Sequence, residues 1–422
     1  MLRKRFNTFG ALLLTGAMLT ACSSEDATVS QPPTPPAVTT YFLTVDAAKG
    51  DNAGYKRALS LDGTTLNASW ATTEKVYVKD GDTWLGGSLT PSANAVRAML
   101  NGAITGFTGS FPCDLTLQFP RQTVDYTGQI GTLADIAAKY DYATTTAHVD
   151  KIDGSNITAT SSVTFENQQA VVKFILKNKA DESDLNATSL GIIAGGLKQT
   201  DSETGYLTIT PTTATNVIYA ALSGVYDGEV TLTAVAGGKT YVFRQPGVTF
   251  AHGKYTAVTV KMSEAAAVAL SAVTASHIGW VIGADGKVYP TLSTAQASTT
   301  AVAMIAYVSS TGHGLALALA DEGSTMAQAA AITAAKSHPA VTGGKWNLAT
   351  VAEWTNMENA NTNLTSLNAK LSAVGKNLKA DRYWTPDNDE GEGTCVNFSG
   401  GFVSSDTQYS VYEQNVRACI SF

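Results

Sequence analysis

The sequence has little of what enzymatic or metal chemistry requires. Charged residues make up only 15% of its 422 residues. Its five histidines never lie at metal-ligand spacing, and the chain contains no HExxH, CxxC or Gly-x-Ser-x-Gly motif. No phosphate-binding glycine loop precedes a helix. The formal net charge of −7 gives no basic footprint for nucleic acid. We therefore expect neither an enzyme nor a nucleic-acid-binding protein, and no cofactor.

Cysteine is also scarce, and long apolar runs are missing after the first 21 residues. Of the four cysteines, Cys113 stands alone, whereas Cys395 and Cys419 are close in sequence. An oxidising compartment would permit a disulfide between these two, and the alternative is a pair of buried free thiols. No later apolar run reaches about 18 residues, so we expect no second membrane segment.

The N-terminus carries a clear targeting pattern. Arg3, Lys4 and Arg5 precede the apolar run Phe9–Met18, and Leu-Thr-Ala follows just before Cys22. A basic start, a short apolar run and a small-residue cleavage site predict a secretory signal at 1–21, because the run is too short to span a bilayer. The Leu-Thr-Ala-Cys stretch resembles the bacterial lipoprotein box, which implies that Cys22 is lipidated. The alternative is a simple secretory signal in which this cysteine has no role.

The residues after the signal indicate a surface protein on a tether. The acidic run at 23–26 resembles the surface-export signals of bacterial lipoproteins. Residues 22–40 contain Gln-Pro-Pro-Thr-Pro-Pro, a proline density that favours a stiff extended tether. Removing 1–21, which holds three basic residues and no acidic one, brings the net charge from −7 to −10. An abundance of Thr, Ala, Ser, Gly and Val is typical of exposed β-sandwiches.

Two β-sandwiches are expected next, at 41–155 and 156–263. The first begins with Tyr41–Ala47, whose alternation predicts an outer strand. A turn-rich stretch then leads to the dibasic pair Lys56-Arg57, which a trypsin-like protease could reach; a solvated pair of loop charges is the alternative. In the second sandwich, Val171, Phe174 and Leu176 indicate a buried central strand. The dipeptide Gly237-Gly238 predicts a hairpin.

The last third, 277–422 after a linker at 264–276, has an α+β pattern. Helices are predicted at 324–337, from Thr350-Val-Ala-Glu353, a capping box, and over Leu364, Leu367 and Leu371. Short strand-like pieces follow, ending with 416–422.

Candidate ligand residues lie in the same region. The acidic loop that includes Asp387 and Asp389 could hold Ca²⁺, although it lacks EF-hand spacing and a solvated loop is the alternative. Trp346, Trp354 and Trp384 are expected in the core. The remaining aromatic residues are surface candidates for stacking on a sugar or anchoring a protein partner, namely Tyr383, Tyr409 and Tyr412.

Taken together, the lipoprotein-type signal, the tether, an early strand before Lys56-Arg57 and two Thr/Ala-rich sandwiches resemble the bacterial fimbrillins, the pilins of the type V pilus. The resemblance covers roughly 22–262. It implies two tandem transthyretin-like β-sandwiches in a mainly β protein. It also implies cleavage between Arg57 and Ala58 by an arginine-specific protease, and loss of the strand Tyr41–Ala47. A strand from a neighbouring subunit would then fill the groove, as in donor-strand complementation.

The last region is similar to the C-type-lectin-like domains appended to tip fimbrillins. The stretches that carry this resemblance are Ile278–Tyr289, Gly343–Trp354, Tyr383–Thr385 and Val416–Cys419, with Asn347 where the family has arginine. The resemblance implies an α+β lectin-like fold for 277–422.

The function implied is that of an adhesive pilus subunit at the cell outer membrane or cell surface, in a fimbrium. Its partners would be other pilin subunits, the outer membrane through the lipid on Cys22, and a host or bacterial glycan or protein. Because 416–422 is expected to close a folded domain, the subunit should accept a strand but donate none, which favours the pilus tip. The alternative is a surface lipoprotein that binds glycan or protein without polymerising.

Overall fold

The computed structural model describes residues 39–49, 60–62, 65–67, 69–120, 124–200, 204–223, 226–389 and 392–422. The expected signal at 1–21, the lipidation residue Cys22 and the cleavage residues Arg57 and Ala58 lie outside the described residues. The described chain is mainly β, as the sequence predicted, with five short α-helices.

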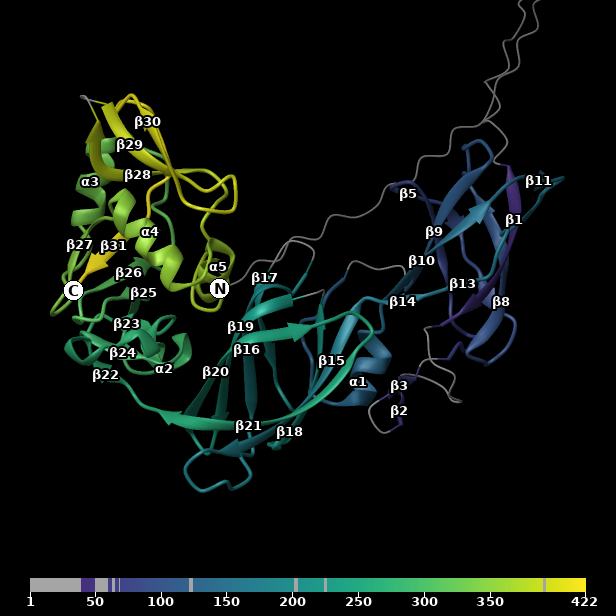
Figure 1. Ribbon diagram of the computed structural model, residues 1–422, viewed down its shortest axis with the longest axis horizontal. Coiled ribbons are helices and arrows are strands. Elements are labelled where there is room, and N and C mark those ends of the chain that lie inside the picture. Colours follow the sequence, from purple (N-terminus) through teal and green to yellow (C-terminus); the bar gives the residue numbers. More distant parts are fainter. Residues whose placement is uncertain are drawn as a thin grey trace, which may run out of the picture. The chain divides into compact units, whose positions relative to one another are not determined.

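The first sandwich consists of two sheets that enclose one core (Figure 1). One sheet has the strand order β11-β12-β1-β8-β6, with β13 also on β1 and β7 on β8; the other has the order β14-β10-β9-β4-β5. A separate hairpin joins β2 to β3. The elements up to β14 are β1 (Thr40–Ala48), β2 (Ser60–Asp62), β3 (Thr65–Asn67), β4 (Tyr77–Asp80), β5 (Thr83–Trp84), β6 (Gly86–Gly87), β7 (Thr90–Pro91), β8 (Arg97–Thr105), β9 (Cys113–Phe119), α1 (Leu133–Lys139), β10 (Ala143–Val149), β11 (Ile152–Asp153), β12 (Asn156–Thr158), β13 (Val163–Thr164) and β14 (Glu166–Asn167).

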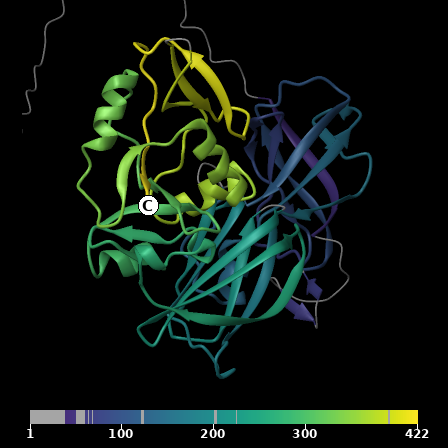
Figure 2. The same ribbon diagram turned by 60° about the vertical axis from the view of Figure 1, so that its left-hand side comes forward.

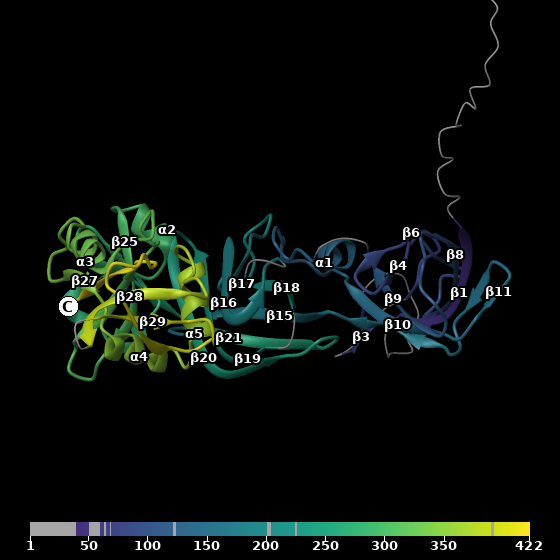
Figure 3. The same ribbon diagram turned by 90° about the horizontal axis from the view of Figure 1, so that it is seen from above.

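Strand β1 is not an outer strand, which corrects the expectation for Tyr41–Ala47. It pairs antiparallel with β8 along its whole length, from Thr40 opposite Thr105 to Ala48 opposite Arg97. On its other side it pairs in parallel with β12 and β13. Figure 3 shows β1 in this sheet from above. The alternation in the sequence fits either position, because one face of the sheet is buried in both cases.

The boundary expected at 155/156 also differs from the structure. Strands β12, β13 and β14 follow that point, yet they pair with β1 and β10 of the first sandwich. Conversely, the segment before β10 contributes Tyr126, Ile136 and Tyr140 to the core of the second sandwich. Gln129 fastens this segment there, because its amide exchanges hydrogen bonds with the backbone of Ala221. The two sandwiches therefore exchange segments, and no single cut in the sequence separates them.

The second sandwich has one continuous strand order, β17-β16-β19-β20-β21-β15-β18. Strand β21 connects the two halves of this sandwich. Its first part pairs with β15, and its last three residues pair with β20. The predicted central strand is confirmed, because β15 lies between β18 and β21. The predicted hairpin at Gly237-Gly238 is also confirmed, with positive φ at both glycines. The strands are β15 (Gln169–Asn178), β16 (Ser189–Lys198), β17 (Thr204–Ile209), β18 (Val217–Ser223), β19 (Tyr226–Ala236), β20 (Lys239–Phe250) and β21 (Tyr255–Ala265).

The C-terminal region is an α+β unit built on the sheet β22-β24-β23-β25-β26-β31-β27, with a second sheet β28-β29-β30, drawn in yellow in Figure 2. Its large sheet is buried on both faces, since alternate residues of β25 and β26 enter two different core clusters. Strand β22 (Val268–Ala269) comes first in this region, and 3₁₀ turns at Leu270–Ala272 and Ala275–His277 follow it. The remaining elements are β23 (Val281–Gly283), β24 (Lys287–Tyr289), α2 (Leu292–Gln296), β25 (Ala301–Val308), β26 (Gly314–Ala318), α3 (Gln328–Lys336), β27 (Lys345–Leu348), α4 (Val351–Ala360), α5 (Leu364–Ser372), β28 (Arg382–Asp389), β29 (Glu392–Asn397), β30 (Ser404–Gln408) and β31 (Ala418–Ser421).

Two of the three predicted helices begin where the sequence placed them. Thr350 and Glu353 form the predicted capping box at the start of α4. The three leucines of α5 are buried, as their spacing predicted. Helix α3, however, begins at Gln328 and not at Ser324, because Met326 forms a β-bridge with Gln414.

Candidate functional site

Strand β1 carries the features expected of an exchangeable strand. Its inward residues Leu43, Val45 and Ala47 are 0% exposed and belong to the core of the first sandwich. The outward Phe42 is 53% exposed. Since β1 has hydrogen-bonded neighbours on both sides, its removal would leave a groove with unpaired backbone groups on each wall and an open apolar floor.

A buried cation closes the C-terminal end of β1. Lys49 follows the strand directly, and its side chain is 1% exposed. Its Nζ lies 2.7 Å from Glu74 Oε1 and 3.2 Å from Asp141 Oδ2. Both carboxylates are also held by their own surroundings: Glu74 Oε2 accepts from the N–H of Ala71 at 3.0 Å, and Asp141 Oδ1 accepts from Gln169 Nε2 at 3.3 Å.

Aromatic rings complete the surroundings of this ammonium group. Lys49 Nζ lies 4.2 Å from the ring centre of Phe119 and 5.3 Å from that of Trp70, which are cation–π distances. The indole N–H of Trp70 donates to the carbonyl oxygen of Ala47 at 3.0 Å, so it also contacts the backbone of β1. Desolvation strengthens the attraction between the ammonium group, the carboxylates and the ring faces.

The lysine site was missed by sequence reasoning, although a signal for it exists. Residues 43, 45 and 47 alternate inward, and Lys49 occupies the next position of the same series. A lysine at an inward position of a buried strand needs a partner, because buried charges are paired. That observation predicts a carboxylate nearby, but it does not identify which one.

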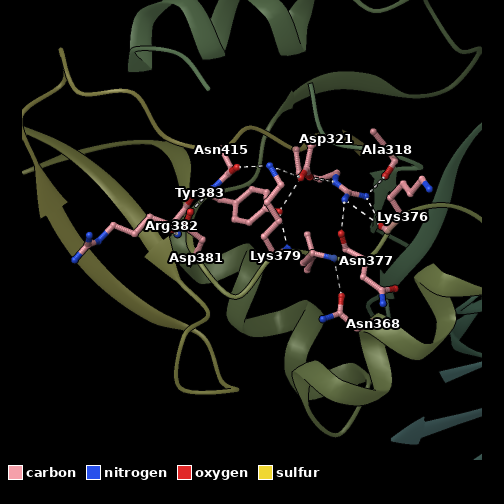
Figure 4. Close-up of polar contacts among 12 residues, drawn as sticks. Ala318, Asp321, Asn368, Lys376, Asn377, Lys379, Asp381, Arg382, Tyr383 and Asn415 are labelled. Atoms are coloured by element: carbon pink, nitrogen blue, oxygen red, sulfur yellow. Dashed lines mark hydrogen bonds and ion pairs between the residues drawn. The ribbon is translucent and has the colours of Figure 1, made fainter. Parts of the chain in front are cut away.

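The candidate ligand residue Tyr383 lies in the interior, so the expectation of a surface tyrosine is wrong. It is 0% exposed. Its hydroxyl donates to Asp321 Oδ2 at 2.9 Å and accepts from the N–H of Lys379 at 2.8 Å (Figure 4). Burial raises the pKa of Tyr383 above its ordinary value near 10; the Lys379 N–H opposes this effect and the Asp321 carboxylate adds to it. The tyrosine was misplaced because β28 is covered on the face that holds Tyr383.

Asp321 belongs to a buried network around Arg417, shown in part in Figure 4. The guanidinium is 0% exposed, and its Nε lies 2.7 Å from Asp321 Oδ1. Its other nitrogens donate to the carbonyl oxygens of Ala318 at 2.9 Å and of Lys376 and Asn377 at 3.1 Å. The planar donor set of arginine is therefore satisfied, and it joins three segments around the start of β31. This network therefore stabilises the fold and does not form an accessible ligand-binding site.

The expected disulfide between Cys395 and Cys419 is not formed; both are free and buried. Cys395 belongs to the core cluster that contains Ala316 and Ile420, whereas Cys419 belongs to the cluster that contains Leu315 and Leu317. Because neighbouring residues of a strand point to opposite faces, the two thiols lie on opposite sides of the large sheet. Burial raises the pKa of Cys395 to about 11 and raises that of Cys419 further.

Asp387 and Asp389 lie at the end of strand β28, which corrects the expectation of a loop. Asp387 Oδ2 accepts from the N–H of Val351 at 2.8 Å, at the start of helix α4, where a carboxylate is favoured. Asp389 is exposed. Among the residues that the structure describes, no group of three His, Cys, Asp or Glu side chains could hold a metal ion. Residues 390 and 391 lie outside the described part.

Two of the three candidate tyrosines are on the surface. Tyr409 and Tyr412 are 58% and 51% exposed, with ring centres 5.6 Å apart and edge to face. A turn holds them together, since the N–H of Tyr412 donates to the carbonyl oxygen of Tyr409 at 2.9 Å. Val411 between them is 74% exposed. This exposed apolar turn is a surface to which a ligand or partner could bind.

Comparisons with solved structures return fimbrial, cell adhesion and pilin proteins among their matches. A fimbrial protein from Bacteroides ovatus aligns over 92% of this chain and 100% of its own, with 11% identity and a TM-score of 0.28. A candidate cell adhesion protein from Bacteroides uniformis aligns over 56% of this chain and 98% of its own, with 13% identity and a TM-score of 0.32. A streptococcal ancillary pilin aligns over 54% of this chain and 63% of its own, with 13% identity and a TM-score of 0.22. TM-scores this low establish no shared fold, so the function proposed below depends on the residues of this chain.

No protein-family model matches the sequence, and no curated protein matches it. Within the described residues, no helix is both long and apolar enough to cross a membrane.

Proposed function

We propose that this protein is a structural and adhesive subunit of a type V pilus, that it is not an enzyme, and that it is assembled by donor-strand complementation. The observation that carries the proposal is the position of β1. It is paired on both sides, it fills the core with Leu43, Val45 and Ala47, and it precedes the dibasic pair Lys56-Arg57. An arginine-specific protease would hydrolyse the bond between Arg57 and Ala58, leaving a carboxylate on Arg57 and an amine on Ala58, and thereby free β1 from the rest of the chain.

The resemblance of the sequence to lipoproteins and tip fimbrillins gives the other parts of the proposal. Lipid on Cys22 would hold the precursor at the outer membrane until cleavage. The two sandwiches would have the transthyretin-like form, and 277–422 the C-type-lectin-like form, of tip fimbrillins. The C-terminal region would be presented outward as the adhesive part, with Tyr409 and Tyr412 as its exposed aromatic contact for a glycan or protein.

A position at the pilus tip is supported by β31. This strand lies between β26 and β27 and is hydrogen-bonded to both. A strand already paired on both sides cannot fill the groove of a neighbour without unfolding its own sheet. The subunit would therefore accept a strand but not supply β31.

A non-polymerising surface lipoprotein is the second candidate. It is favoured by one observation: with β1 in place, the sheet β12-β1-β8 is complete without a partner. Such a protein would remain on its lipid and bind glycan or protein.

The N-terminus of the protein at the cell surface distinguishes the two candidates. Sequencing of surface protein from cells that express it natively should find Ala58 as the first residue. A lipid-modified Cys22 that persists at the surface would support the lipoprotein instead. Immunogold labelling with antibodies against 275–422 should mark pilus ends, and label along the shaft would contradict the tip position.

A further inference from the structure

We propose that the groove vacated by β1 ends in a receptor for a cationic side chain, and that the incoming donor strand carries a lysine or arginine at the place of Lys49. This inference rests on the proposed function and specifies the chemistry of the partner. Lys49 lies on the N-terminal side of Arg57, so cleavage there would remove Lys49 together with β1. Glu74 and Asp141 would stay behind with the sandwich.

The register places the cation at a fixed point of the groove. Leu43, Val45 and Ala47 fill three successive inward positions, and Lys49 fills the fourth. The N–H of Lys49 donates to the carbonyl oxygen of Val96 at 2.8 Å, so the backbone is still held alongside the segment before β8. A donor strand paired in the same register would therefore direct its fourth inward side chain at the two carboxylates.

Apart from the hydrogen bond from the Trp70 indole to Ala47, several contacts that shape the receptor are independent of β1. Glu74 is tied to its own turn, since its backbone N–H donates to the carbonyl oxygen of Ala71 at 2.9 Å. Asp141 is tied to Gln169. Trp70 packs edge to face on Phe165, with ring centres 5.0 Å apart. These contacts join residues of the sandwich to one another, so two acidic groups and an aromatic wall would remain in place after β1 leaves.

Among the described residues, Lys49 is the cation that pairs with Glu74 and Asp141, so the vacated site would hold negative charge without it. Asp141 is 6% exposed, and a buried carboxylate without a partner is strongly unfavourable. An apolar residue at the fourth inward position would leave this charge uncompensated, and an acidic residue would add repulsion. The donor strand that fits has two apolar residues and one small residue at alternate positions, followed by lysine or arginine.

The test uses the chain from residue 23 onward with a sequence-specific protease site in place of 53–58. After nicking, a labelled peptide TYFLTVDAAKG, which is the sequence of residues 40–50, is exchanged into the protein. Unlabelled peptides then compete with it. These peptides carry the native sequence, Lys49→Arg, Lys49→Met or Lys49→Glu, and the matched control is Asp46→Asn at an outward position. The protein is the same in each of these peptide competitions, so none of them requires a substituted chain to fold.

The native and Lys49→Arg peptides should compete about equally, as should the control, within about threefold. The Lys49→Met peptide should be weaker by about 30-fold or more, because it leaves a buried charge unpaired. The Lys49→Glu peptide should not compete. In a nicked chain with Glu74→Gln and Asp141→Asn, the Lys49→Met peptide should bind as tightly as the native one.

Two negative results have different meanings. If the native peptide enters the groove and the Lys49→Met peptide competes equally well, the cation receptor is refuted while strand exchange stands. If the native peptide does not enter the nicked protein at all, strand exchange itself is refuted, and the receptor with it.

Discussion

Strands β1 and β31 occupy equivalent positions in two different parts of the molecule but are secured in different ways. Each lies between two strands of its sheet, β1 between β8 and β12/β13, and β31 between β26 and β27. Each has a buried cation next to it in sequence, Lys49 directly after β1 and Arg417 directly before β31.

The difference lies in the partners of the two cations. Among the described residues, the ammonium group of Lys49 contacts side chains: two carboxylates and two ring faces. Arg417 meets one carboxylate and three backbone carbonyl groups, which lie on segments that it draws together. A site made of side chains that are already held in place can release its cation and take another. A site made of backbone carbonyl groups from separate segments is assembled by the arginine itself. This difference agrees with the proposal that β1 is replaced on assembly and that β31 is retained.

The largest effect is expected for Arg417→Met. It should lower the free energy of unfolding of the C-terminal region by about 3–5 kcal/mol, because it leaves Asp321 buried without its cation and three carbonyl groups without a donor. Urea unfolding, with hydrogen exchange to locate the loss in 277–422, measures this. A loss below about 1 kcal/mol would mean that the segments around Arg417 keep their structure without it. Arg417 would then not differ from Lys49 in assembling its own site.

A smaller effect is expected for Lys49→Met in the uncleaved chain. The loss should be about 2–3 kcal/mol, because Glu74 is 20% exposed and water can partly replace the ammonium group. Adding Glu74→Gln and Asp141→Asn should recover most of it, since no charge then remains buried. If the triple variant is as unstable as Lys49→Met alone, packing of the lysine stem, and not charge pairing, is what matters at this site.

Alkaline pH should weaken the network around Arg417, because it contains the titratable Tyr383. It should not weaken the site around Lys49 in this way, because the aromatic rings there do not titrate. The folded-state pKa of Tyr383 is raised above the unfolded value, so its contribution to stability is complete below pH 10 and is lost as pH rises above it. Hydrogen exchange between pH 7 and 11 should show 277–422 losing protection. Tyr383→Phe should reduce this pH dependence while costing about 1 kcal/mol at pH 7. An unchanged pH dependence in that variant would assign the loss to other tyrosines.

The smallest effect is expected for Arg97→Ala, which tests a second ion pair of β1. Arg97 and Asp46 are 2.9 Å apart but 48% and 42% exposed. Removal should cost about 0.2–1 kcal/mol in the same urea experiment, because exposed pairs gain little over water. A loss as large as that of Lys49→Met would show that burial does not set the value of ion pairs on this strand.

Local patterns gave the class of the fold and several of its elements, but not the partners of its strands. The capping box at Thr350, the leucines of α5 and the Gly237-Gly238 hairpin are encoded by nearby residues, and all three are confirmed. The central position of β1 and the return of β12 to its side depend on contacts between residues more than 100 positions apart, which periodicity does not encode. For the same reason the boundary at 155/156 is wrong.

The candidate site was predicted only where exposure follows from local sequence. Tyr409 and Tyr412 lie in a turn that polar residues flank in the sequence, and both are exposed. Tyr383 lies on a strand, and whether its face is covered depended on Asp321, more than 60 residues earlier. The expected disulfide between Cys395 and Cys419 is not formed because the two cysteines lie on strands of different sheets, β29 and β31, and pack into different core clusters. The sequence alone does not define these sheets. Lys49 was overlooked although its alternation with Ala47 is local.

The hydrogen bond from the Trp70 indole N–H to the Ala47 carbonyl oxygen should make the fluorescence of Trp70 depend on whether β1 occupies the groove of the first sandwich. With β1 seated, this indole is dry, has an acceptor and faces an ammonium group. An empty groove would admit water to the same ring and take both neighbours away. A change in the emission of Trp70, one of the six tryptophans of the chain, would thus distinguish filled subunits from vacant ones with no dye attached.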